Sequence, residues 1–181
     1  MTQSSLNLGI IISSTREGRV GDTVAQWVKE QVAARTGANL TLIDLRNYQL
    51  PLLGEGTPQH LDQFKADVAA QDGFIFVTAE YNHSIPAALK NAIDYLREEW
   101  HHKAAGIVSY GSAGGARAAE HLRAILGELK IADVRAHVLL SLFHDFENFS
   151  TFKPQEGVHK ANLDALVSEV TAWATALKTI R

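Results

Sequence analysis

The chain of 181 residues contains no cysteine. Disulfide bonds, thiolate nucleophiles and iron–sulfur clusters all need cysteine sulfur, so the sequence excludes them. Any redox chemistry would have to come from a bound cofactor. The formal net charge of -3 provides no broad positive field, so we expect no binding to nucleic acid.

Long apolar segments are also missing. No apolar run approaches the roughly 20 residues that a membrane-spanning helix needs. Residues 1–5 lack the basic start and the apolar core of a secretory signal. We therefore expect a cytoplasmic protein without membrane contact.

Two nucleotide-binding motifs are absent. The dinucleotide fingerprint G-x-G-x-x-G does not follow the first expected strand, and the phosphate-loop motif G-x-x-x-x-G-K-[ST] does not occur. These absences disfavour a standard NAD-binding Rossmann domain and a P-loop nucleotidase.

The sequence does contain alternating strand and helix patterns along its whole length. Apolar segments predict strands at residues 6–12, 40–45, 74–78, 105–110 and 134–140. Helical spacing or start signals predict helices from about Asp22, from Thr57-Pro58, after Pro86, and over 118–129 and 163–177. The alternation predicts a single α/β domain over residues 1–181, a doubly wound parallel sheet of five strands with helices on both faces.

Such sheets bind ligands at the carboxyl ends of their strands, and the loops after strands one, three and four carry unusual residues. The first loop, residues 13–22, combines hydroxyl groups, two glycines and two arginines before a helix. Free backbone amides at a helix start suit a phosphate, and Arg16 and Arg19 would add charge-assisted hydrogen bonds. An ordinary solvated turn with a capping residue explains this loop equally well.

The second loop, residues 79–84, offers the aromatic face of Tyr81 and the donors and acceptor of Asn82. This mixture suits a flat heteroaromatic ligand. The alternative is a surface turn in which Glu80 is a solvated charge, followed by a helix cap.

The third loop, residues 109–117, is rich in glycine. Glycine lacks a Cβ, so a ligand could approach the backbone closely, although a tight strand-to-helix turn would also use glycine. A serine nucleophile elbow is excluded, because G-x-S-x-G would need glycine where Tyr110 stands.

Taken together and in order, these motifs resemble the NADPH-dependent FMN reductases, a group of flavodoxin-like quinone, azo-dye and chromate reductases. The residues that carry the resemblance are Ser14-Thr15-Arg16 with Gly18-Arg19-Val20-Gly21, then Glu80-Tyr81-Asn82-x-Ser84-x-Pro86, then Gly111-Ser112-x-Gly114-Gly115-x-Arg117. The resemblance implies the strand order 2-1-3-4-5, FMN bound without a covalent link, and a homodimer or homotetramer.

The resemblance also implies the cofactor contacts. It assigns the FMN phosphate to Ser14, Arg16, Arg19, Val20 and Gly21. It assigns the ribityl chain and the ring to Ala79, Glu80, Tyr81 and Asn82, and the pyrimidine edge to Ser109, Gly111, Ser112 and Gly114. No side chain is expected to be an obligatory catalytic acid or base, and no metal site is expected. Two residues depart from the family pattern: Ala79 stands where the family has proline, and Ser13 where it has glycine.

The implied activity is ping-pong transfer of two electrons from NADPH, or NADH, through FMN to a small acceptor such as a quinone, an azo compound, chromate or free flavin. The start of the helix after Gly115 is expected to stabilise negative charge on the reduced flavin. Trp100 is expected to contact a partner subunit. Residues 143–157 either cover the acceptor site or pack beneath a long connection.

Two other functions fit the same architecture. One is an FMN-binding electron carrier or redox sensor without a substrate of its own. The other is a hydrolase, which would need a nucleophile and a histidine base that the sequence does not reveal.

Overall fold

The computed structural model describes residues 5–181, with residue 156 described by its backbone alone. The main sheet contains β1 (Asn7–Ile12), β2 (Asn39–Asp44), β3 (Gly73–Ala79), β4 (Ala104–Gly111) and β5 (Ala132–Ser141). The helices are α1 (Gly21–Ala33), α2 (Leu61–Ala69), α3 (Ala87–Asp94), α4 (Ala116–Glu128) and α5 (Glu156–Leu177). Two short strands, β6 (Phe146–Glu147) and β7 (Thr151–Phe152), form an antiparallel hairpin between β5 and α5.

The five main strands are parallel and lie in the order β2-β1-β3-β4-β5. This arrangement confirms the predicted doubly wound, flavodoxin-like sheet. The strand order reverses beside β1, because β2 pairs with one of its edges and β3 with the other. Ligands of such sheets bind at the carboxyl ends of the strands near this reversal.

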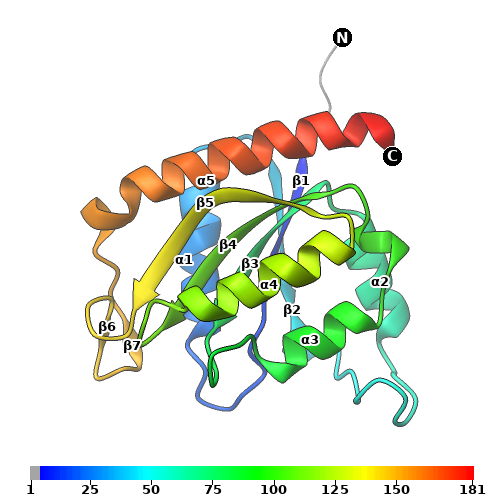
Figure 1. The fold of residues 1–181 in the computed structure, drawn as a ribbon, viewed down its shortest axis with the longest axis horizontal. Helices are drawn as coiled ribbons and strands as arrows, with labels where there is room; N and C mark the ends of the chain where they lie inside the picture. Colours follow the sequence, from blue (N-terminus) through cyan, green and yellow to red (C-terminus); the bar gives the residue numbers. More distant parts are fainter. Residues whose placement is uncertain (1–4) are drawn as a thin grey trace.

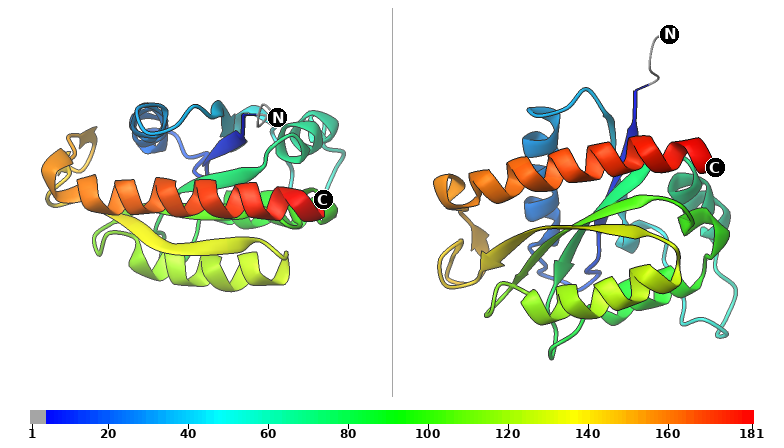
Figure 2. Two further views of the ribbon diagram at one scale, coloured as in Figure 1. Left: turned by 90° about the horizontal axis from the view of Figure 1, so that it is seen from above. Right: turned by 45° about the horizontal axis from the view of Figure 1, so that its top comes forward.

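Alternate residues of the strands supply two separate hydrophobic cores. The first lies between the sheet and α1 and α5, and the second lies between the sheet and α2, α3 and α4. Figure 1 shows α5 on one side of the sheet and α3 and α4 on the other, and the tilted view in Figure 2 shows the same layers. The strand β3 is buried along its whole length, as expected for a central strand covered on both faces.

The carboxyl ends of the strands bring distant loops together. The β1–α1 loop (residues 13–20), the β3–α3 loop (80–86) and the β4–α4 loop (112–115) all leave the same edge of the sheet, and the β6–β7 hairpin follows at the end of β5 (Figure 1). These are the three loops that the sequence singled out.

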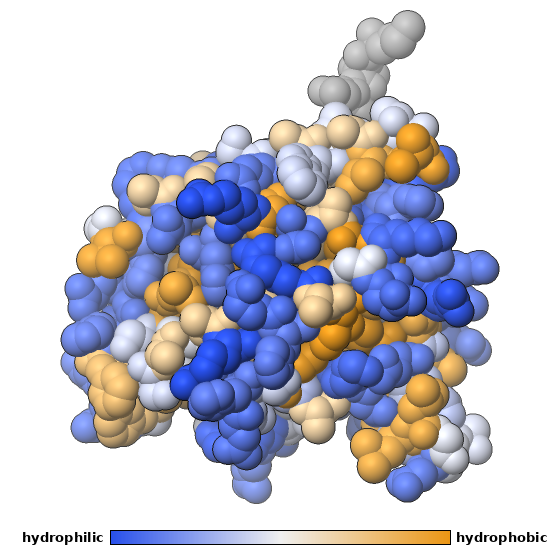
Figure 3. Space-filling model, in the orientation of Figure 1, coloured by the Kyte–Doolittle hydropathy of each residue, from blue (hydrophilic) through white to orange (hydrophobic). Residues whose placement is uncertain are grey.

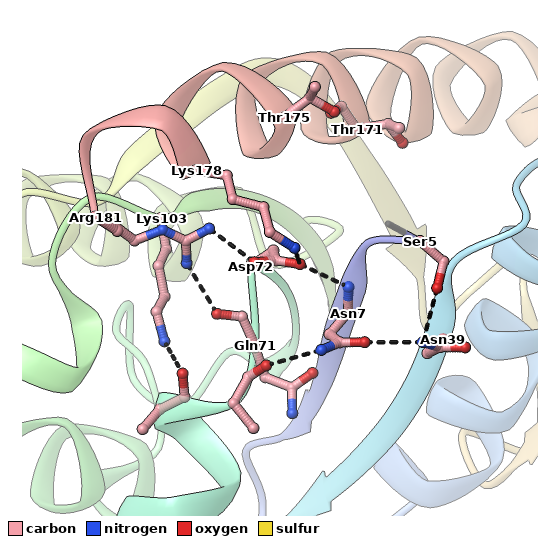
Figure 4. A network of polar contacts seen from close by, with 12 residues as sticks. Ser5, Asn7, Asn39, Gln71, Asp72, Lys103, Thr171, Thr175, Lys178 and Arg181 are labelled. Atoms are coloured by element: carbon pink, nitrogen blue, oxygen red, sulfur yellow. Dashed lines mark hydrogen bonds and ion pairs between the residues drawn. The ribbon is translucent and has the colours of Figure 1, made fainter. Parts of the chain in front are cut away.

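The opposite edge of the sheet carries a network of polar contacts (Figure 4). The carboxylate of Asp72 accepts hydrogen bonds from the amide of Asn7 at 2.9 Å, from Lys178 at 2.9 Å and from Arg181 at 2.8 Å. Lys103 donates to the last carbonyl groups of α2 at 2.7 and 3.0 Å. The contacts of Asp72 with Lys178 and Arg181 fasten the C-terminal turn to the start of β3.

Two details differ from expectation. The helix α2 begins at Leu61, not at Thr57-Pro58, because the first carbonyl to accept a helical hydrogen bond is that of His60.

Trp100 does not contact a partner: its side chain is 1% exposed and packs against Phe64 and Phe74 in the core of this chain. The expectation for Trp100 was wrong because this residue lies beyond the end of α3, in a 3₁₀ turn that folds back under the sheet.

Across residues 5–181, none of the helices has the length and apolar character needed to span a bilayer.

Candidate functional site

The N-terminus of α1 is open to a ligand. Its N-cap residue is Val20, which is half-buried against the first core and whose side chain cannot accept a hydrogen bond. Within the part of the chain that the structure describes, the backbone amides of residues 15–20 donate to no protein acceptor. Free amides and the positive end of the helix dipole together favour an anion at this position.

Hydroxyl groups and a cation surround this helix start. The Ser14 hydroxyl lies 2.8 Å from that of Tyr81, which links the β1–α1 loop to the β3–α3 loop. Arg16 is exposed, and its guanidinium lies 5.8 Å from the centre of the Tyr81 ring. Among the side chains that the structure describes, no carboxylate forms an ion pair with Arg16, so its charge remains available to a ligand.

Arg19 is placed differently from Arg16. It donates to the Asp44 carboxylate at 2.7 and 2.5 Å and to the Ser14 carbonyl at 2.6 Å. The Arg19 side chain is only 7% exposed. These contacts fix the β1–α1 loop to the end of β2, so Arg19 supports the loop from beneath.

Tyr110 is a residue of this site that the sequence analysis did not select. It ends close to α1: a Cβ added at Gly21 would lie 2.8 Å from the Tyr110 hydroxyl oxygen. Burial raises the pKa of Tyr110, so its hydroxyl stays protonated. Its position at the carboxyl end of β4, where ligands of such sheets bind, is the signal that could have identified it. Gly21 is required here because any side chain would collide with this tyrosine.

The β3–α3 loop begins with a tight turn over Tyr81, Asn82, His83 and Ser84. The backbone groups of Tyr81 and Ser84 exchange hydrogen bonds of 2.9 and 3.1 Å. Asn82 and His83 occupy the left-handed region, with φ of 49° and 70°, and both are exposed. This turn lifts Asn82 away from the sheet, where its amide is accessible, while Ala79 remains buried at the end of β3.

Glu80 has a structural partner that the sequence did not suggest. Its carboxylate accepts hydrogen bonds from the backbone amides of Arg117 and Ala118 and forms an ion pair with the Arg117 side chain. Burial alone would raise the pKa of Glu80, but the hydrogen bonds from Arg117 and these amides outweigh burial and lower it. Glu80 therefore supplies the negative charge at the start of α4.

The proposed use of the α4 helix dipole needs correction for this reason. The start of α4 was expected to stabilise charge on a flavin, but the Glu80 carboxylate already occupies the first amides of the helix. A second negative charge there would be repelled by the first.

The glycines of the β4–α4 loop serve the turn itself. Gly114 and Gly115 have φ of 66° and 76°. A Cβ added to Gly111 would lie 3.1 Å from Glu80, and one added to Gly115 would lie 2.7 Å from Ser109. Ser112, by contrast, is exposed at the tip of the loop. The close contacts of Gly111 and Gly115 therefore fit the tight-turn explanation.

Ser109 is fully buried beneath this loop. Its hydroxyl lies 2.7 Å from the Gly114 carbonyl and 2.8 Å from His137 Nε2. This pairing supplies the serine and histidine that a hydrolase would need, but a buried hydroxyl that already donates to a carbonyl cannot attack a substrate.

The segment after β5 contains two pairs of phenylalanines with different surroundings. Phe146 and Phe152 pack beneath the connection, with ring centres 5.1 Å apart. Phe143 and Phe149 are 61% and 60% exposed and contact each other edge to face. Figure 3 shows a largely hydrophilic face with separate apolar patches, one of them at the end that carries this hairpin.

A buried hydrogen bond between Asp145 and His159 anchors the hairpin. Asp145 lies 2.7 Å from His159 on α5 and accepts the backbone amides of Ser141 and Gln155. The contacts of Asp145 therefore fix the hairpin that carries the exposed phenylalanines, at the same edge of the sheet as the three loops.

Comparison with known proteins identifies the family. The family model described as NADPH-dependent FMN reductase matches residues 6–145, which include all three loops. An NAD(P)H-dependent FMN reductase of Schizosaccharomyces pombe is 37% identical over 132 residues, covering 67% of this chain and 66% of that protein. A quinone reductase of Escherichia coli K12 is 27% identical over 185 residues, covering 97% of each chain.

Solved structures agree on the fold. FerB, a flavoenzyme NAD(P)H:(acceptor) oxidoreductase from Paracoccus denitrificans, superposes with a TM-score of 0.74 at 19% identity, covering 94% of this chain and 98% of FerB. The chain belongs to the NADPH-dependent FMN reductase family, and the resemblance inferred from its motifs is confirmed. It is an oxidoreductase of a family whose description names FMN and NADPH.

Proposed function

We propose that this protein binds FMN across the three loops and passes electrons from NAD(P)H to small organic acceptors. The observation that carries the proposal is the start of α1, which has no side-chain cap and is bordered by free amides and by Arg16. The amides of residues 15–20 before this helix donate to no protein acceptor in the described chain, and Asp22 in the first turn accepts the amide of Thr23. Free amides before a helix start, within a sequence that matches this family, fit the FMN phosphate.

The residues divide into those that would touch FMN and those that hold the loops. Ser14, Arg16 and the amides of residues 15–21, including Val20 and Gly21, would bind the phosphate. Tyr81, Asn82, Ser112 and the backbone of Ala79, Gly111 and Gly114 would line the rest of the cofactor. Three further residues would hold the loops in place without contacting FMN, since each is already paired within the protein: Arg19, Glu80 and Ser109.

FMN would supply the redox chemistry, by accepting hydride from the nicotinamide and returning two electrons to the acceptor. The protein would contribute position and access. The Asn82 turn and Ser112 are exposed, which leaves room for the nicotinamide and the acceptor to use one place in turn. This shared site leads to ping-pong kinetics, with NADPH or NADH as donor.

We propose quinones as the main acceptors, with azo compounds, chromate and free flavin as further candidates. The exposed Phe143 and Phe149 pair beside the β4–α4 loop would favour flat, apolar molecules. The name of the Escherichia coli relative, quinone reductase, supports this choice. We also propose a homodimer or homotetramer in which this exposed pair lies near a neighbouring subunit.

Steady-state kinetics test the mechanism. Initial rates with FMN-loaded protein are measured at several fixed concentrations of benzoquinone while NADPH is varied, and then with NADH. Parallel double-reciprocal lines are expected because each substrate leaves before the other binds. Intersecting lines would show that donor and acceptor bind together and would contradict a shared site.

The electron-carrier alternative predicts a different result. A carrier or sensor would bind FMN tightly, yet NADPH added without oxygen would leave the flavin oxidised over minutes. Reduction within seconds would exclude it. The hydrolase alternative has no support at Ser109, the serine that pairs with a histidine, because its hydroxyl is buried.

A further inference from the structure

A chain of two hydrogen bonds connects the edge strand β5 to the glycine loop. His137 on β5 contacts the Ser109 hydroxyl on β4, and that hydroxyl contacts the Gly114 carbonyl in the β4–α4 loop. The three residues lie in different elements. Ser109 and His137 are 28 residues apart, so their contact could not be predicted from the sequence.

The direction of both hydrogen bonds follows from the chemistry of the groups. A carbonyl oxygen can only accept, so the Ser109 hydroxyl donates its proton to Gly114. The Ser109 oxygen must then accept from His137, which fixes the proton of the histidine on Nε2. Both bonds, at 2.7 and 2.8 Å, are of normal length.

The charges around His137 keep its ring neutral. Burial, with a smaller contribution from the nearby Arg123 on α4, lowers the pKa of His137 to about 4. Arg123 is itself paired with Asp133 on β5. Protonation would add a proton at Nδ1 and leave the Nε2 donor in place, so the link to Ser109 persists across the physiological pH range.

The link acts on the least constrained part of the loop. Gly114 and Gly115 are consecutive left-handed glycines, and glycine is the residue with the greatest backbone freedom. The hydroxyl of Ser109 holds the carbonyl of the peptide between them, directly after Ser112 and Ala113. A Cβ added at Gly115 would lie 2.9 Å from the Ser109 hydroxyl, so the loop is wrapped closely around this side chain.

We propose that His137 is a positioning residue for the cofactor-facing loop 111–115, acting through Ser109. The inference rests on the proposed function in one respect, namely that this loop contacts FMN. It assigns a functional consequence to a residue of the edge strand that touches no ligand.

The test compares two substitutions of His137. His137→Leu removes the donor, whereas His137→Gln keeps an N–H donor at nearly the same reach as Nε2. Asp72→Asn, at the opposite edge of the sheet, is the control for a general loss of stability. For each full-length protein, FMN affinity is measured by quenching of flavin fluorescence, and hydrogen exchange of the loop amides is measured without FMN.

Removing one hydrogen bond that orders the loop is expected to raise the FMN dissociation constant about three- to tenfold in His137→Leu. Exchange at residues 112–116 should accelerate by a similar factor. His137→Gln should recover most of both effects, and Asp72→Asn should lower the melting temperature without changing either.

The proposal is overturned if His137→Leu lowers the melting temperature but leaves FMN affinity and loop exchange at wild-type values, or if Leu and Gln behave alike. If wild-type protein binds no FMN, the proposed function fails. The exchange data then decide alone: faster loop exchange in Leu but not in Gln supports the positioning role, and unchanged exchange refutes it.

Discussion

Arg16 and Arg19 are three residues apart, and their sequence context gives them the same expected role. The structure separates them, and this separation can be tested by replacing each with glutamine. Arg19 makes three hydrogen bonds, two of them to Asp44, and is nearly buried. Arg16 is exposed, and its guanidinium lies over the Tyr81 ring.

The expected magnitudes follow from these contacts. Arg19→Gln leaves the Asp44 carboxylate, whose side chain is 17% exposed, without its partner. Breaking a largely buried pair costs about 2–4 kcal/mol, and for a chain of this size the melting temperature should fall by roughly 4–16 °C. Arg16→Gln should change stability by less than about 0.5 kcal/mol, because an exposed side chain contributes little to folding.

FMN affinity, in contrast to stability, should change mainly in Arg16→Gln. Loss of a charge-assisted hydrogen bond to a phosphate is expected to cost about 1–2 kcal/mol, so Arg16→Gln should raise the FMN dissociation constant roughly 5- to 30-fold. The assay combines thermal unfolding of FMN-free protein with a fluorescence titration. The reasoning is refuted if Arg19→Gln keeps the wild-type melting temperature, or if Arg16→Gln binds FMN as tightly as wild type.

Three further predictions concern the same framework. Glu80→Gln should destabilise the protein at neutral pH. Folding lowers the pKa of Glu80, so the contribution of its carboxylate to the free energy of unfolding is complete above about pH 4.3 and is lost as the pH falls. Wild type and variant should therefore reach similar stability in acid. Gly21→Ala should cost about 1–3 kcal/mol through collision with the Tyr110 hydroxyl, and Tyr110→Phe in the same chain should restore most of it. Burial lowers the pKa of Lys103 to about 8, so between pH 8 and about 10.4 this group binds more protons in the unfolded chain. The stability of wild type relative to Lys103→Met should therefore rise with pH over this range.

Each of these predictions can fail clearly in chemical denaturation. A constant difference between wild type and Glu80→Gln down to pH 3 would show that the carboxylate is unpaired. If Tyr110→Phe does not restore the stability lost in Gly21→Ala, the collision does not involve the Tyr110 hydroxyl. A pH dependence shared by wild type and Lys103→Met would assign the titration to another group.

The strands and their layers could be predicted from the sequence because the signals are local. Apolar runs such as residues 74–77 fall in a strand that is buried on both faces. Helical spacing located α1 within one residue of its start at Gly21. The strand order came from the family resemblance, and the structure confirms it.

The pairings inside the site could not be predicted, because they join residues distant in sequence. Glu80 and Arg117 are 37 residues apart, and Arg19 and Asp44 are 25 apart. A list of polar residues around a loop does not say which ones are already satisfied by the protein. The sequence therefore located the loops, whereas the resemblance assigned Arg19 and Glu80 to FMN although both are paired within the protein.

The central claim is that the three loops together bind FMN, and the most direct measurement is a titration of FMN-free protein with FMN. Flavin fluorescence and the visible absorbance spectrum are followed in wild type and in Arg16→Gln. The account predicts saturable binding with one FMN per chain and weaker binding in Arg16→Gln at unchanged stability. Absence of binding, or equal affinity in the two proteins, would contradict it.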